Sequence, residues 1–200
     1  MIRGDQTNAL VLKYIIRSIF LFITAFFLAC SKPPEEEKPV NKSLIVTAGP
    51  NVNEYNNGSN PIVIRLYQLS GRSEFEEADF WSIFNNSSEE LAGIVVDRRS
   101  LSPIYPGESR LVALDIEPEA FYLAAFAEFA DYETQNFRDV IVIDEEILDL
   151  GVSVSITASG VSIIAKNADG SSSKINDGNK KPKSITKKVV KRLKGLLGGD

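Results

Sequence analysis

Carboxylates are the side chains of this chain that could most readily do chemistry, because two of them facing each other across a cleft can hydrolyse a glycosidic bond. Such a pair needs a separation of about 5–10 Å, which only the fold can create. The acids instead occur in short runs at predicted helix and strand ends, at residues 35–37, 76–77, 89–90 and 144–146. Nothing in their spacing pairs any two of them, so we predict solvated surface and no enzyme.

The chain has no histidine and a single cysteine, Cys30. Without imidazole, Ser-His-Asp and Cys-His catalysis are excluded, and so is any metal site that needs histidine ligands. The acids between residues 131 and 149 lack the spacing of a calcium-binding loop. We therefore expect no metal, no cofactor and no small-molecule substrate.

The amino-terminal segment, residues 1–29, has the pattern of an export signal. Arg3, Lys13 and Arg17 precede an uncharged run at residues 18–28. This run is shorter than the roughly 20 residues of a membrane-spanning helix. Its length is typical of the apolar region of a signal peptide.

Cys30 follows this run directly and resembles the cysteine of a bacterial lipobox, which is acylated after cleavage. An ordinary signal peptide or an uncleaved anchor with a chance cysteine is the alternative. We favour lipidation, with a diacylglycerol and an N-acyl chain, because an exported free thiol would be a liability. Ser31 follows in place of Asp, which implies sorting to the periplasmic face of the outer membrane. Residues 30–42 are rich in Pro, Glu and Lys, and we expect a lipidated tether.

Charge divides the mature chain into an acidic body and a basic tail. Residues 30–173 contain ten Lys and Arg against twenty-four Asp and Glu, whereas residues 174–200 contain nine against two. The net charges are therefore −14 and +7. Because nucleic-acid binding requires a basic face on the domain, the acidic body argues against nucleic acid as a partner.

Short apolar runs separated by turn signals fill residues 43–166 and predict about eight strands. We expect strands at residues 44–48, 62–69, 99–104, 110–116, 121–129, 137–143, 152–157 and 161–165. Since no strand–helix alternation suggests a parallel sheet, the predicted fold is an all-β, antiparallel two-sheet sandwich. Ile62, Ile64 and Leu66 are predicted core residues, and the very apolar run 121–129 is expected to be central.

One inserted helix is expected at residues 73–85. Ser73 and Glu76 have the spacing of a capping box, which would start the helix. Three aromatic residues lie on its apolar stripe: Phe80, Trp81 and Phe84. Aromatic residues at helical spacing are more often packed on a sheet than exposed as a carbohydrate-stacking platform, so we predict packing.

The segment between the first two strands is a long loop rich in Asn and Gly. Long loops on a rigid scaffold tend to carry recognition, although a passive surface loop is equally compatible with this composition. The candidate partner-binding residues are Pro50, Asn51, Val52, Asn53, Glu54, Tyr55, Asn56, Asn57, Gly58, Ser59 and Asn60.

Residues 167–200 are expected to form a flexible tail that ends in a basic amphipathic helix. Its apolar positions are Ile185, Val189, Leu193 and Leu196. Its candidate membrane or partner contacts are Lys187, Lys188, Lys191, Arg192 and Lys194. The same segment could instead lie on the acidic body or remain disordered.

Several segments together resemble the TssJ family, the outer-membrane lipoproteins of the type VI secretion system. They are NPIVIRLYQL at residues 60–69, FEEADFW at 75–81, PGES at 106–109, and YLAAFAEF at 122–129 with FR at 137–138. The resemblance covers about residues 43–165. It implies a transthyretin-like β-sandwich with a helical insertion, no enzymatic activity, and an acylated Cys30.

The resemblance also implies a partner, the periplasmic C-terminal region of the inner-membrane protein TssM. In the family, the loop between the first two strands contributes to this contact, and here it corresponds to residues 50–60. The basic tail has no counterpart in the family pattern. The alternative function is a periplasmic lipoprotein that binds glycan or peptidoglycan through the Trp81 region and the tail.

Overall fold

The computed structural model describes residues 38–166 and 171–173 of the chain. Its longer strands are β1 (Val40–Ala48), β4 (Ile64–Leu69), β5 (Val95–Ser100), β6 (Ser109–Ile116), β7 (Tyr122–Ala127), β8 (Arg138–Val142), β9 (Val152–Thr157) and β10 (Gly160–Lys166). Three two-residue strands are β2 (Glu54–Tyr55), β3 (Gly58–Ser59) and β11 (Ser172–Ser173). The helices are α2 (Ser73–Glu77), α3 (Phe80–Asn85), α4 (Glu89–Ile94) and α5 (Glu145–Leu150).

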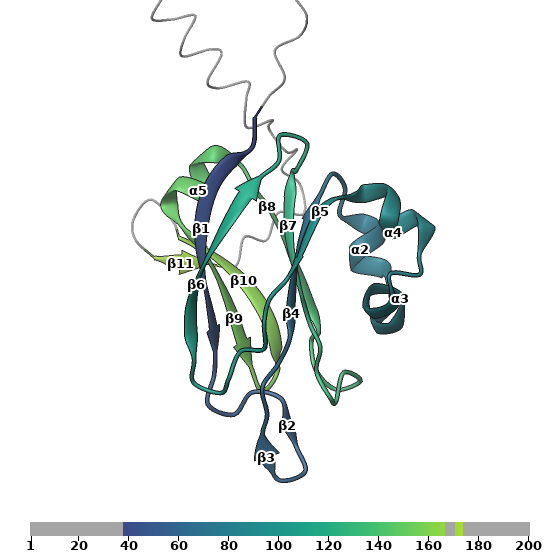
Figure 1. Cartoon of the computed structure of the whole chain (residues 1–200), viewed down its shortest axis with the longest axis vertical. Helices are drawn as coiled ribbons and strands as arrows, with labels where there is room; N and C mark the ends of the chain where they lie inside the picture. The colour runs from purple at the N-terminus through teal and green to yellow at the C-terminus, as the bar shows by residue number, and fades with distance from the viewer. Residues whose placement is uncertain (1–37, 167–170, 174–200) are drawn as a thin grey trace, which may run out of the picture. The chain divides into compact units, whose positions relative to one another are not determined.

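Two sheets face each other and enclose the main hydrophobic core (Figure 1). One has the strand order β11-β10-β9-β1-β6, and the other has the order β5-β4-β7-β8. Strand β1 shows how the core is built, because Leu44, Val46 and Ala48 are buried while the residues between them are exposed. The predicted all-β, two-sheet sandwich is confirmed, and Ile62, Ile64 and Leu66 are core residues as expected.

One strand pairing differs from the antiparallel prediction. Strand β1 pairs antiparallel with β6 but parallel with β9, with Leu44 opposite Val152. The other pairs of longer strands are antiparallel, and the tight turn between β9 and β10 allows no other direction for that pair. Because β1 and β9 lie far apart in the chain, no hairpin constrains their relative direction.

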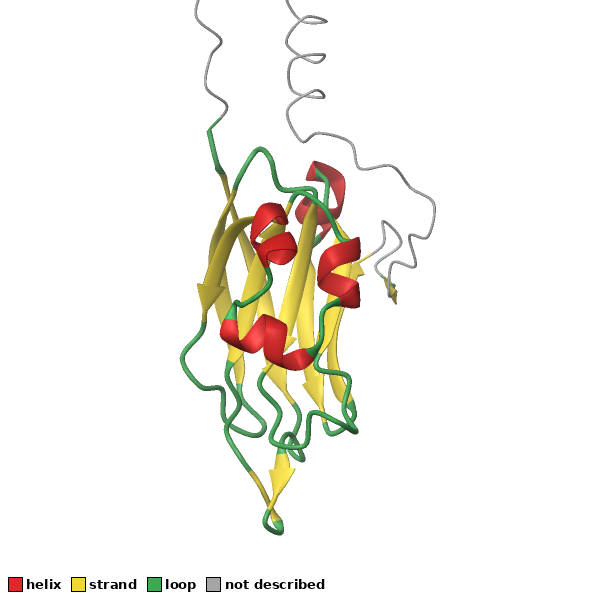
Figure 2. Cartoon of the chain, turned by 90° about the vertical axis from the view of Figure 1, so that its right-hand side faces the viewer, coloured by secondary structure: helices red, strands yellow, loops and turns green. Residues whose placement is uncertain are grey.

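The central strands of the four-stranded sheet, β4 and β7, are buried on both faces. Every residue of β7 from Leu123 to Ala127 is buried, and β7 lies between β4 and β8 as predicted for the most apolar run. The face away from the sandwich core is covered by α2, α3 and α4 (Figure 2). This contact forms a second core of Tyr67, Leu69, Phe75, Phe80, Ile83, Leu91, Ala124, Phe126 and Val140.

The predicted single helix at residues 73–85 is wrong in detail, because it is broken into α2 and α3. Ala78 has an extended backbone with ψ 137°, and the Asp79 carboxylate accepts a hydrogen bond from the Ser82 N–H at 3.0 Å. Asp79 is thus the N-cap of a new helix. The expected capping box is also wrong, since Arg72 occupies the N-cap position of α2 and makes no side-chain capping bond.

Several element boundaries differ from the prediction. The strand expected at 99–104 is β5, which ends at Ser100, and Ile104 makes only an isolated bridge to Ile62. Strand β1 begins at Val40, inside the predicted tether, and β11 lies inside the predicted tail. Helix α5 is absent from the predicted elements. The acidic residues 144–146 at its start were predicted to be solvated surface. Asp144 instead caps the helix, because its carboxylate accepts a hydrogen bond from the Ile147 N–H at 2.9 Å.

Side chains join the two sheets at both edges of the sandwich. The buried Gln68 amide donates to the Asp115 carbonyl and accepts from the Glu117 N–H, each at 2.8 Å. At the opposite edge, the Ile163 N–H donates to the Asp139 carboxylate at 2.7 Å. These bonds satisfy edge groups that no strand pairs, and they fix the register of one sheet against the other.

Candidate functional site

The predicted recognition loop lies at one end of the sandwich, together with three other loops. The register shows this, because the end of β1 adjoins the start of β6 through Thr47 and Ser109, and adjoins the end of β9 through Ala48 and Ile156. In the other sheet, the start of β4 adjoins the end of β7. Figure 1 shows the hairpin β2–β3 projecting from this end. We call it the hairpin end.

The Asn-rich segment is a β-hairpin rather than an irregular loop. Strands β2 and β3 pair Tyr55 with Gly58, so Asn56 and Asn57 form a two-residue turn. Both have positive φ, 54° and 63°, which is the requirement of a type I′ turn. Asparagine tolerates this conformation better than most residues, which explains why two consecutive asparagines form the turn.

Two side-chain amides organise the base of the hairpin. Asn60 Nδ2 donates to the carbonyl oxygens of Asn53, Tyr55 and Gly58 at 2.8–3.2 Å. Asn53 Nδ2 donates to the Pro61 carbonyl at 3.1 Å, and its Oδ1 accepts from the Ala130 N–H at 2.8 Å. The hairpin is thereby fixed both to its own ends and to the loop after β7.

The predicted contact residues fall into two groups, buried and exposed. Val52 is fully buried and Asn53 is only 7% exposed, so neither presents a surface for a partner. Pro50, Asn51 and residues 54–59 are exposed, and Asn60 is half-buried. Tyr55 is the largest of the exposed group, with 57% of its surface accessible. Together with Ala130 and Asp131, the hairpin lines an open concavity.

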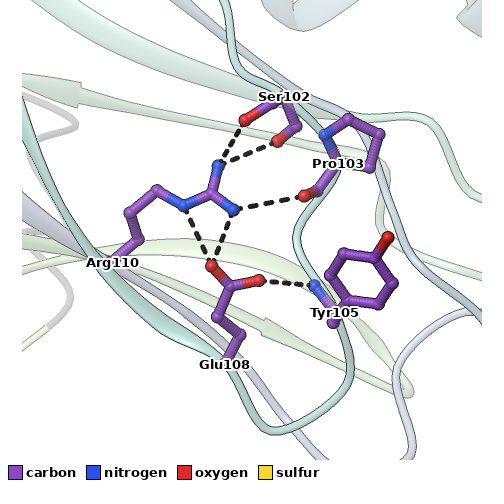
Figure 3. A network of polar contacts seen from close by, with 5 residues as sticks. All are labelled: Ser102, Pro103, Tyr105, Glu108 and Arg110. Atoms are coloured by element: carbon purple, nitrogen blue, oxygen red, sulfur yellow. Dashed lines mark hydrogen bonds and ion pairs between the residues drawn. The ribbon is translucent and has the colours of Figure 1, made fainter.

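A second exposed tyrosine at the hairpin end was not predicted as a contact. Tyr105 precedes the PGES turn, and 62% of its surface is accessible. As Figure 3 shows, Arg110 fixes this loop by donating to the Glu108 carboxylate and to the carbonyls of Ser102 and Pro103. The pKa of Glu108 is lowered by the hydrogen bond from the Tyr105 N–H, and further by Arg110.

The PGES turn itself was correctly predicted, with Gly107 at φ 79° as a type II turn requires. The arginine that fixes it gave no signal in the sequence, because two of its acceptors are backbone carbonyls of the same loop. The turn also contacts the start of the recognition loop, since the Gly107 N–H donates to the Ala48 carbonyl at 3.1 Å.

The aromatic prediction holds for Phe80 and fails for Trp81. Phe80 is buried against Phe126 and Tyr132, with ring centroids 5.1 and 4.2 Å away. Trp81 is one position further round the helix, and 50% of its surface is exposed. Its indole N–H donates to the Tyr132 hydroxyl at 3.1 Å.

The remaining predicted residues are remote from this end or outside the described structure. Cys30, the export segment and the basic tail residues 187–194 lie outside the described ranges. The described ranges contain no group of three acidic, cysteine or histidine side chains arranged to hold a metal ion. No helix within residues 38–166 and 171–173 is long and apolar enough to cross a membrane.

The described residues form a two-sheet sandwich with helices over one sheet and a hairpin at one end. Residues 41–159 match the family described as type VI secretion lipoprotein, VasD, EvfM, TssJ. The chain therefore belongs to this family. Its members are structural, membrane-associated lipoproteins of the type VI secretion system.

Solved structures share the fold. The lipoprotein TssJ1 of Pseudomonas aeruginosa is 24% identical with a TM-score of 0.55, covering 65% of this chain and 98% of that chain. Lip of Serratia marcescens, a membrane-bound component of the type VI secretion system, is 23% identical with a TM-score of 0.56, covering 64% and 99%. A structure named as the TssM C-terminal domain (869–1107) from EAEC matches at 24% identity and a TM-score of 0.52, covering 61% and 98%. Among curated proteins, no sequence matches this chain.

We expect Asn53→Ala to lower the free energy of unfolding by about 3 kcal/mol, because it leaves the Pro61 carbonyl and the Ala130 N–H without a partner. Urea denaturation followed by circular dichroism measures this. Asn51→Ala is the matched control, since Asn51 is exposed in the same loop. Equal stability of the two variants would show that the Asn53 amide does not hold the hairpin.

Proposed function

We propose that this protein anchors the type VI secretion membrane complex to the outer membrane. In this proposal a lipid on Cys30 holds the protein in the membrane, and the hairpin end binds the periplasmic C-terminal domain of TssM. The function is mechanical: the sandwich carries load between the lipid and the partner, and no reaction is catalysed.

The observation that supports this proposal is that β1 begins at the end of the sandwich opposite the hairpin. Strand β1 begins at Val40 at one end of the sandwich, and the hairpin β2–β3 projects from the other (Figure 1). Val40 is ten positions after Cys30, and a chain of that length spans at most about 35 Å. A lipid on Cys30 would therefore keep the β1 end near the membrane and direct the hairpin into the periplasm.

The hairpin end also has the physical properties of a recognition surface. Its backbone is fixed by the amides of Asn53 and Asn60, so that little conformational entropy is lost on binding. Tyr55 and Tyr105 are exposed there, and tyrosine is enriched among residues that dominate binding energy. Glu54 and Asp131 line the same concavity as Tyr55, and their charge favours a partner with basic or amide groups.

The similar structure named for the TssM domain supports the choice of partner. The matched region is 61% of this 200-residue chain and 98% of the other, so the matched chain has about 124 residues. The named range, 869–1107, spans about 239 residues. The matched chain is thus about half as long as the TssM fragment, and we infer that a chain of this sandwich fold accompanies the fragment.

Cys30→Ser is expected to move the protein from the membrane fraction to the soluble periplasmic fraction, because the acyl chains supply the anchor. Fractionation and immunoblotting measure this. Ser31→Asp serves as the control, since it preserves Cys30 and should leave the protein in the inner membrane instead of releasing it. Retention of Cys30→Ser in the membrane would contradict a lipid anchor at this residue.

Tyr55→Ala is expected to weaken binding of a TssM periplasmic fragment by about 2 kcal/mol, roughly 30-fold in Kd, without changing the thermal unfolding midpoint. Isothermal titration calorimetry measures the affinity. Glu119→Ala is a suitable control, because Glu119 is exposed in the loop between β6 and β7, at the end of the sandwich opposite the hairpin. If both variants bind like the unchanged protein, the partner does not use the hairpin.

The half-exposed Trp81 favours a second candidate, glycan or peptidoglycan binding. Aromatic rings exposed on one face can stack on sugars, and Phe84 and Tyr132 lie 5.5 Å from the Trp81 ring. We expect acrylamide to quench Trp81 fluorescence in either case. A shift of the emission on adding soluble peptidoglycan fragments would support this candidate, and an unchanged spectrum would exclude stacking on Trp81.

A further inference from the structure

Trp81 is held in one orientation on α3, although half of its surface is exposed. Phe84, Phe80 and Tyr132 form a stack of rings, with neighbouring centroids 5.7 and 4.2 Å apart and planes within 17° of parallel. The Trp81 ring stands at 76–88° to all three, and its indole N–H donates to the Tyr132 hydroxyl. We call the surface formed by Trp81, Phe84 and Tyr132 the Trp81 face.

Exposed carboxylates lie close to the Trp81 face in the chain. Glu77 and Asp79 precede Trp81, and Glu133 follows Tyr132. None of these three acids, which we call the acidic rim, forms an ion pair with another residue of the described ranges. An aromatic ring and a carboxylate each attract Lys and Arg side chains, so the chemistry of this surface suits a basic partner.

The arginines of this region do not neutralise the acidic rim. Arg65 is paired with Glu128. Arg138 interacts electrostatically with Asp79, but its guanidinium donates to backbone carbonyls at the end of α2. The Ser82 hydroxyl and N–H donate to the Asp79 carboxylate at 2.6 and 3.0 Å, which lowers the pKa of Asp79 and keeps it ionised at neutral pH. Three carboxylates against one arginine leave the surface negative.

The same chain contains a segment of complementary chemistry. Residues 185–196 combine an apolar stripe at helical spacing with five Lys and Arg and no acid. This segment lies outside the described residues. It begins twelve positions after Ser173, and a chain of twelve residues spans up to about 40 Å. Strand β10, to which the described chain end is paired, is about 24 Å long, so the segment can reach either end of the sandwich.

We propose that residues 185–196 dock on the Trp81 face of the same molecule. The apolar stripe packs on Trp81 and Phe84, and the Lys and Arg side chains pair with the acidic rim. A short flexible linker gives an effective concentration of about 1 mM. At that concentration, a segment with a Kd of about 0.1 mM occupies the face about nine-tenths of the time. The docked segment covers the ring that a glycan would use, so the two compete for it. The proposal does not depend on the hairpin contact.

Trp81 is the only tryptophan of the chain, so its fluorescence reports on this face directly. Acrylamide, an uncharged quencher, is titrated into the full chain and into a variant in which Gln replaces Lys187, Lys188, Lys191, Arg192 and Lys194. We expect the Stern–Volmer constant to be at least twofold larger for the variant. The constant of the unchanged chain should rise towards it in 1 M NaCl, where the Debye length is about 3 Å. Equal constants for the two chains would overturn the proposal.

A charge exchange tests the contact itself. Glu77→Lys combined with Glu133→Lys should increase quenching as the Gln variant does, and adding Lys188→Glu and Lys191→Glu should restore the protection. Glu119→Lys is the control, because Glu119 is exposed at the end of the sandwich opposite the hairpin, and it should be quenched like the unchanged chain. Failure of the exchanged chain to regain protection would contradict the docking. Protection that increases with protein concentration would assign the contact to a second copy and would overturn the proposal as well.

Discussion

Burial of β4 and β7, the central strands of the four-stranded sheet, on both faces is the constraint from which the rest of this fold follows. An apolar strand such as β7 has no side that can face water, so each face requires a covering layer. The five-stranded sheet covers one face, and α2, α3 and α4 cover the other. The helical insertion between β4 and β5 is therefore needed to cover the outer face of this sheet.

Two arginines that belong to the buried sheet hold the helices in place. Arg65 lies between the Phe84 and Phe126 rings, pairs with Glu128, and donates to the Phe84 carbonyl at 2.7 Å. Arg138 donates to the carbonyls of Glu76 and Ala78, at the end of α2. Cations at carboxyl ends of helices satisfy carbonyls that have no partner within the helix. The break between α2 and α3 is stable because these carbonyls are satisfied from the sheet.

Buried amides have the corresponding role at the sandwich edges and at the hairpin end. Gln68 joins the two sheets, and Asn53 joins the hairpin to the loop after β7. Each amide uses both donor and acceptor, so that it costs little to bury and fixes one arrangement. A scaffold fixed at these points can present a small hairpin rigidly, as the proposed function requires.

The amino-acid sequence by itself determined the features that depend on local pattern. Strand alternation predicted the two-sheet sandwich and the core positions of Ile62, Ile64 and Leu66, and the apolar run at 121–129 predicted the central strand. The Pro-Gly pair predicted the turn at residues 105–108. The absence of histidine is a property of composition, and it excludes every catalytic mechanism that requires imidazole, whatever the fold.

Only the tertiary structure decided the features that depend on partners distant in the chain. Asn53 could contact a partner or be buried inside the domain, and its hydrogen bond with the Ala130 N–H, 77 residues later, decides for burial. The direction of β9 beside β1 is likewise fixed by no hairpin. Local residue patterns report which face of an element is apolar, but they do not report which distant backbone groups remain to be satisfied.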